Sequence, residues 1–145
     1  MTRSIAAALG AFAMAAMPLG VQAEPTVDVQ TRCFQIAGQP GRRVQLRLIA
    51  TSDGNEAAFV RHRGAKAWLP LVLSRRRLLP QADSGRSEID TEWLEVAQGR
   101  VTGRYALAML GNEVVSFDYL DVKTGRGTAF ETAPTPRGID PCEAR

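Results

Sequence analysis

The chain has 145 residues, of which 45% are hydrophobic, and it carries a formal net charge of +3. This length suits one domain with a modest core, and the N-terminal apolar run is too short for a membrane span and is followed by no second one. The sequence holds two cysteines and one histidine. Without a C-x-x-C spacing or a second histidine, neither a redox motif nor a zinc site is indicated.

The first 23 residues have the pattern of an export signal. Met1-Thr2-Arg3 forms a short positive region, Ile5 to Met17 is uncharged and rich in alanine, and Val21-Gln22-Ala23 fits a small-x-small cleavage site. A buried N-terminal helix fits less well, because a helix that is apolar on all sides needs a large core. We therefore expect a signal peptide at 1–23 and a mature chain that begins at Glu24 and is periplasmic or secreted.

From residue 27 onward, apolar and polar residues alternate with a period of two, which is typical of half-buried strands. Turn-forming stretches such as TSDGNE and LGNE separate the alternating segments. About eight strands are predicted, near residues 27–36, 43–51, 57–63, 66–74, 87–96, 100–109, 113–121 and 127–131. The pattern indicates one all-β domain over 24–145, a small antiparallel meander closed into a barrel or folded into a sandwich. Arg75 to Ser87 is predicted as the long connection, and 133–145 as an irregular C-terminal tail.

Glycine positions predict how neighbouring strands are joined. Ser52-Asp53-Gly54 and Ala97-Gln98-Gly99 fit three-residue hairpin loops whose last residue is left-handed. The first loop places Leu46 opposite Val60, and the second places Glu92 opposite Arg104. For the hairpin at Arg63 to Lys66, a two-residue loop is expected.

The two cysteines, Cys33 and Cys142, stand near the two ends of the mature chain. In an oxidising compartment an even cysteine count indicates a disulfide. We therefore predict a Cys33–Cys142 bridge, with two free thiols as the alternative.

The positive charge is concentrated in the first half of the mature chain. Residues 24 to 80 carry ten Arg or Lys against four Asp or Glu, whereas residues 81 to 145 carry seven against eleven. Strand alternation places one group of basic residues and a tryptophan on a single outer sheet face. This basic face consists of Arg43, Arg47, Arg61, Arg63, Lys66 and Trp68.

Two interpretations of the basic face stay open. Glu88, Asp90 or Glu92, or the acidic tail, could neutralise it within the chain. Alternatively, the face binds an anionic partner, since guanidinium groups beside an aromatic ring suit phosphates, sulfates, uronic acids and acidic protein surfaces. In either case a cation-π contact between Arg61 and Trp68 is expected.

No catalytic constellation emerges from the sequence. His62 is expected on the inner face at a strand end, where no second ligand or nucleophile can be placed beside it. Asp53-Gly54-Asn55 lacks the twelve-residue spacing of a calcium loop and fits a turn better. No G-x-S-x-G, H-E-x-x-H or P-loop motif occurs. We expect no enzymatic activity, no metal, no cofactor and no nucleic-acid partner.

The mature chain resembles small exported β-proteins in general character. It is similar to periplasmic lysozyme inhibitors in size, export and β-barrel character. The Ser-Gly-x-x-Tyr loop of those inhibitors is not matched, because SGRSE keeps Ser84 and Gly85 but has Glu88 in place of the tyrosine. The resemblance therefore assigns no inhibitory residues.

The sequence favours an exported binding or interaction module of the cell envelope. Its expected partner is an acidic glycan or an acidic protein, bound through the basic face. The alternative is an inhibitor of a hydrolase, such as lysozyme or a protease, that acts through a loop such as Arg75 to Ser87. The oligomeric state is left open.

Overall fold

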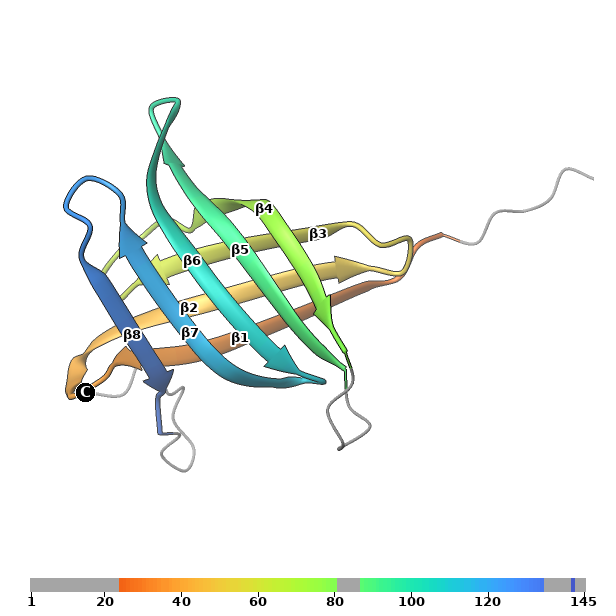
Figure 1. The fold of residues 1–145 in the computed structure, drawn as a ribbon, viewed down its shortest axis with the longest axis horizontal. Helices are drawn as coiled ribbons and strands as arrows, with labels where there is room; N and C mark the ends of the chain where they lie inside the picture. The colour runs from red at the N-terminus through yellow and green to blue at the C-terminus, as the bar shows by residue number, and fades with distance from the viewer. Residues whose placement is uncertain (1–23, 81–86, 135–141, 143–145) are drawn as a thin grey trace, which may run out of the picture.

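The protein is a closed antiparallel β-barrel, seen in a computed structural model that describes residues 24–80, 87–134 and 142 (Figure 1). Each strand pairs with its sequence neighbours, and β8 pairs with β1 to close the barrel. This confirms the all-β meander and decides for a barrel. The eight strands are β1 Val27–Ile36, β2 Gln39–Thr51, β3 Glu56–His62, β4 Leu69–Leu79, β5 Glu88–Ala97, β6 Arg100–Leu110, β7 Glu113–Asp121 and β8 Gly127–Thr132.

The predicted export signal lies outside the described residues, as do 81–86, 135–141 and 143–145. Within the part of the chain that the structure describes, no helix is long and apolar enough to cross a membrane.

Inward-facing side chains from all eight strands form the core inside the barrel. Successive strand residues point to opposite faces, so the alternating apolar residues meet inside. An aromatic cluster dominates: the ring centroids of Phe34 and Phe117 are 4.7 Å apart, and those of Phe117 and Phe130 are 4.9 Å apart. The buried core residues are Phe34, Val44, Leu46, Ala58, Val60, Leu71, Trp93, Tyr105, Leu107 and Phe117.

The predicted pairing of β2 with β3 is confirmed. Leu46 lies opposite Val60, and Val44 lies opposite His62. The Thr51 amide donates to the Asn55 carbonyl at 3.0 Å across the three-residue loop, and Gly54 has a φ of +89°. A left-handed glycine at the end of the loop is what this connection requires.

The predicted pairing of β5 with β6 is wrong by two residues. Trp93 lies opposite Tyr105, and Leu94, not Glu92, lies opposite Arg104. The loop has two residues, since Gln98 and Gly99 both have positive φ (50° and 71°). This is the backbone of a type I′ turn, whose twist matches that of the strands. A bulge between Glu95 and Val96 follows the turn, and the shift of two residues leaves every side chain on its predicted face.

A further bulge, between Ala108 and Met109 of β6, changes which valine of β7 faces inward. Val114 lies opposite Met109 and packs against the core. Val115, which strict alternation would place on the same face as Phe117 and Tyr119, is 56% exposed. The irregularity reverses the alternation locally, so the simple period of two fails at this position.

The strand β4 is longer than predicted. Arg75, Arg76 and Arg77, which were expected to begin a solvated connection, lie within β4 and pair with β5. A bulge between Leu73 and Arg75 precedes them. The pairing of β4 with β3 has the register that a two-residue loop between Arg63 and Lys66 implies, but it is limited to three residue pairs, from Ala58–Leu71 to Val60–Leu69.

The Cys33–Cys142 disulfide is present, as predicted, with the two Cα atoms 5.4 Å apart. Cys33 lies on the outer side of β1, opposite Gln45. Both cysteines and Ala133 are buried together in a small second cluster. The bridge therefore fixes residue 142 outside the barrel wall, beside β1 and β2.

Candidate anion-binding face

The basic face lies on the outer side of β2 and β3 and on the loop that follows β3. Alternation on paired strands places Arg43, Arg47 and Arg61 on this side, as predicted. The loop begins with a turn in which the Ala65 amide donates to the His62 carbonyl at 2.9 Å. Gly64 is left-handed within this turn, which therefore ends one residue earlier than the predicted Arg63-to-Lys66 loop. Lys66 is exposed beyond it.

Trp68 is in contact with two arginines. The guanidinium carbon of Arg61 lies 4.8 Å from the centroid of the indole, which confirms the predicted cation-π contact. Arg47 lies closer, at 4.1 Å, and the sequence did not predict this contact. Both arginines are held by their Nε atoms, since Arg61 donates to Gln45 Oε1 at 2.8 Å and Arg47 donates to Thr31 Oγ1 at 3.3 Å.

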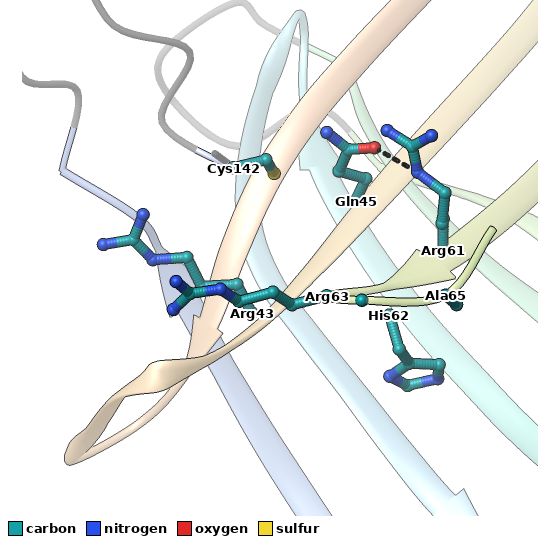
Figure 2. A pocket seen from close by; sticks show the side chains of 8 residues that line it. Arg43, Gln45, Arg61, His62, Arg63, Ala65 and Cys142 are labelled. Carbon is teal, nitrogen blue, oxygen red and sulfur yellow. Dashed lines mark hydrogen bonds between the residues drawn. The ribbon is translucent and has the colours of Figure 1, made fainter. Parts of the chain in front are cut away.

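Arg43 and Arg63 extend the face toward the end of β3. The Arg63 amide donates to the Arg43 carbonyl at 2.9 Å, so the two residues are neighbours across the hairpin. Figure 2 shows their guanidinium groups close together on one side of the ribbon. Backbone carbonyls accept from both: Arg43 Nε donates to Pro40 at 3.1 Å, and Arg63 Nη1 donates to Gly41 at 3.3 Å. These acceptors offset part of the repulsion between like charges.

A shallow hollow of about 270 Å³ lies between these side chains and the disulfide. Figure 2 shows Arg61 and Gln45 joined by their hydrogen bond, with Cys142 across the strands from them. The lining residues are Arg43, Gln45, Arg61, His62, Arg63, Gly64, Ala65 and Cys142. The polar groups of this lining are predominantly hydrogen-bond donors.

The carboxylates proposed as internal counter-charges lie elsewhere. Glu92 forms ion pairs with Arg75, at 3.8 Å, and with Arg104, at 3.7 Å, on the outer side of β4, β5 and β6. Arg104 thus meets Glu92 diagonally although the predicted register was wrong. Among residues 24–80, 87–134 and 142, no carboxylate forms an ion pair with Arg61 or Arg63. The acidic residues of the C-terminal tail, Asp140 and Glu143, lie outside the described residues.

His62 lies at the end of β3, opposite Val44, on the inward-facing side of the strand as predicted. Its ring is exposed and points away from Arg61 and Gln45 in Figure 2. The described residues contain no group of three or more His, Cys, Asp or Glu side chains that could hold a metal ion. Asp53 and Asn55 form a turn, in which the hydrogen bond from the Thr51 hydroxyl lowers the pKa of Asp53.

A partly buried polar network lies on the inner side of β5 and β6 and was not foreseen from the sequence. Thr102 Oγ1 donates to Glu95 Oε1 at 2.7 Å, and the Tyr105 hydroxyl donates to Glu95 Oε2 at 3.2 Å. Burial, with the nearby Glu95 carboxylate, raises the pKa of Tyr105 well above its usual value. Each group is satisfied by its neighbours, so the network acts as a structural element of the core.

The segment considered for hydrolase inhibition, Arg75 to Ser87, is reassigned in part. Its residues through Leu79 belong to β4, and 81–86, which include Ser84 and Gly85, lie outside the described residues. No described contact distinguishes this segment as an inhibitory loop. Comparison of the chain with protein-family models, curated proteins and solved structures gives no significant match.

Proposed function

We propose that this protein is an exported binding module of the cell envelope that engages an anionic partner, an acidic glycan or an acidic protein, through its basic face. The observation that carries the proposal is the stacking of Arg47 and Arg61 on Trp68, beside Arg63. Arg61 and Arg63 have no carboxylate partner among the described residues.

The stacking supports anion binding because it fixes guanidinium groups without neutralising them. The N–H donors of a guanidinium lie in the plane of that group, so they remain available along its edges when its face covers an aromatic ring. Arg47 and Arg61 use Nε for protein acceptors, and no hydrogen bond from their terminal amino groups is seen within the described residues. Such groups lose little conformational entropy when they bind a carboxylate, sulfate or phosphate through paired hydrogen bonds.

Export is part of the proposal. The N-terminal sequence has the charged, apolar and small-residue regions of a signal peptide. The Cys33–Cys142 disulfide supports an oxidising compartment, because disulfides rarely persist in the cytosol of mesophiles.

The test measures binding of the mature chain to two immobilised polyanions, heparin and poly-glutamate, at about 0.1 M and about 1 M salt. We expect binding to at least one of them at low salt and loss at high salt, because exposed charges are screened. Arg61→Ala combined with Trp68→Ala should weaken binding roughly tenfold or more, since charge-assisted hydrogen bonds are each worth about 1.5 to 3 kcal/mol.

The matched control is Arg104→Ala, which also removes one guanidinium but from a residue that pairs with Glu92 on another part of the wall. This variant should bind as the unmodified chain does. Circular dichroism of all three proteins checks that the fold is retained. If the double variant binds as well as the unmodified chain, or if Arg104→Ala weakens binding equally, the basic face is not the binding site.

A further inference from the structure

The barrel interior has an apolar hollow at one of its two ends. A cavity of about 220 Å³ lies at the end where β2, β4 and β6 terminate, toward the right of Figure 1. Its floor includes Trp93 and Leu107, both of which are 3% exposed. Leu48, Ile89 and Met109 line its sides. The cavity therefore has an apolar interior formed by core residues of the barrel.

The short pairing between β3 and β4 explains why this end is open. The last pair toward the cavity is Ala58–Leu71, after which β4 continues along β5 alone. An ion pair between Glu56 of β3 and Arg76 of β4 spans the gap, and both residues line the cavity. Leu78 lies opposite Ile89 and is 68% exposed, so apolar surface continues from the cavity to solvent.

The polar groups around the cavity are engaged with one another. Gln30 Nε2 donates to Asp28 Oδ2 at 2.9 Å, and Arg32 Nη2 donates to Gln30 Oε1 at 3.1 Å. The same Arg32 atom donates to the Asn112 carbonyl. Inside, Trp93 Nε1 donates to Thr91 Oγ1 at 3.0 Å.

These partnerships determine which ligand the cavity can accept. A charged molecule would have to break the Glu56–Arg76 pair or lose its hydration without compensation. A neutral apolar molecule would break no ion pair and lose no strong hydration. Its binding is favoured because its apolar surface and that of the cavity are removed from water. An apolar cavity of about 150 Å³ holds benzene, so 220 Å³ suits a somewhat larger ring system.

We propose that this end of the barrel is a second binding site, which takes a compact, neutral, apolar molecule the size of one or two fused rings. The site is separate from the basic face: most of its lining residues occupy inward-facing strand positions, and neither Arg61 nor Trp68 lines it. The basic face selects anions and the cavity excludes them.

The test uses Trp93 as a reporter. Trp68→Phe leaves Trp93 as the only tryptophan of the chain, and in this background 2-naphthol is titrated while tryptophan fluorescence is followed. We expect saturable quenching with one site per chain and a Kd of about 0.1 mM or tighter, an ordinary efficiency for a ligand of this size. The anion 2-naphthalenesulfonate, which has the same rings, should quench at least tenfold more weakly.

A matched pair of variants locates the site. Both Ala50 and Ala106 are exposed, but Ala50 lines the cavity near the end of β2, whereas Ala106 lies on the outer side of β6 and does not line it. In the Trp68→Phe background, Ala50→Leu should raise the Kd for 2-naphthol at least tenfold, and Ala106→Leu should leave it unchanged. Thermal melting of the unmodified chain gives a variant-free check, because a ligand that binds only the folded state raises Tm.

The proposal is overturned by any of three results. These are the absence of saturable quenching and of a Tm shift with 2-naphthol, equal binding by the Ala50→Leu and Ala106→Leu variants, and equal affinity for 2-naphthol and its sulfonate. None of these results depends on whether the basic face binds polyanions.

Discussion

Gly103 shows how a single residue accommodates the packing of the barrel interior. A Cβ atom at this position would lie 2.3 Å from Cε2 of Tyr119, whose ring covers the glycine. Glycine in a strand interior commonly marks such a close approach. We predict that Gly103→Ala lowers the free energy of unfolding by about 1 to 3 kcal/mol, because the ring or the strand must shift. Urea unfolding followed by circular dichroism measures the change.

Gly41 provides the control for this substitution. It lies in β2, a Cβ atom added to it would meet no other atom within 4 Å, and it does not have a positive φ. Gly41→Ala should therefore leave stability unchanged or raise it slightly, since alanine restricts the unfolded chain. Equal losses for both variants would show that contact with Tyr119 is not the cause.

The residues that make up the basic face could be predicted from the sequence, but the contacts between them could be predicted only in part. Alternation along β2 and β3 is enough to place Arg43, Arg47 and Arg61 on one side. The contact of Arg47 with Trp68 depends on the path of the loop after His62, and this loop has no periodicity from which its path could be deduced. The cavity was not predicted either, because it results from where β3 and β4 separate.

At the scale of elements, the β5–β6 hairpin contains a residue that is poorly suited to its backbone. Gln98 has a φ of +50°, a region in which asparagine is several-fold enriched over most other residues. Type I′ turns favour Asn-Gly for this reason. We predict that Gln98→Asn raises the free energy of unfolding by roughly 0.5 kcal/mol, measured by urea unfolding.

Gly99→Ala is the opposing variant for this turn. Gly99 also has a positive φ, of +71°, and no neighbouring atom within 4 Å of an added Cβ, so the substitution tests backbone strain alone. It should lower the free energy of unfolding by about 1 kcal/mol. A two-residue turn is not supported if Gln98→Asn destabilises the protein while Gly99→Ala has no effect.

The strands themselves were predictable because their alternation is regular, but the bulges were not. Some bulges lie beside a turn whose composition looks ordinary, as between Glu95 and Val96, and one lies within a ladder, between Leu73 and Arg75. The sequence A-Q-G is compatible with loops of two or three residues, and the packing of Tyr119 against Gly103 lies outside any local pattern. The extension of β4 through Arg75–Arg77 was missed because three charged residues were expected to face solvent in a connection.

At the scale of the whole molecule, the two ends of the barrel interior differ. Phe34, Tyr105, Phe117 and Phe130 fill the part near the closure between β1 and β8. The other end retains a cavity where the wall is joined by few pairs. A hollow lined by His62, Tyr119 and Phe130 lies at the first end as well. The two ends therefore differ in the side chains beside the hollow, mainly aromatic rings at the first and the Trp93 and Leu107 floor at the second.

The Cys33–Cys142 disulfide links the wall to residue 142 across a sequence separation of 109 residues. A bridge that closes so long a loop restricts the unfolded chain, by about 4 to 5 kcal/mol in the loop-entropy description. We predict that Cys33→Ser combined with Cys142→Ser lowers the free energy of unfolding by about 2 to 5 kcal/mol, measured in urea beside the unmodified chain with and without a thiol reductant. Reduction of the unmodified chain should reproduce the loss and should leave the double variant unaffected. Titration of the denatured, unreduced protein should detect no free thiol, and two free thiols would contradict the bridge itself. Identical unfolding of the oxidised and reduced protein would contradict its stabilising role.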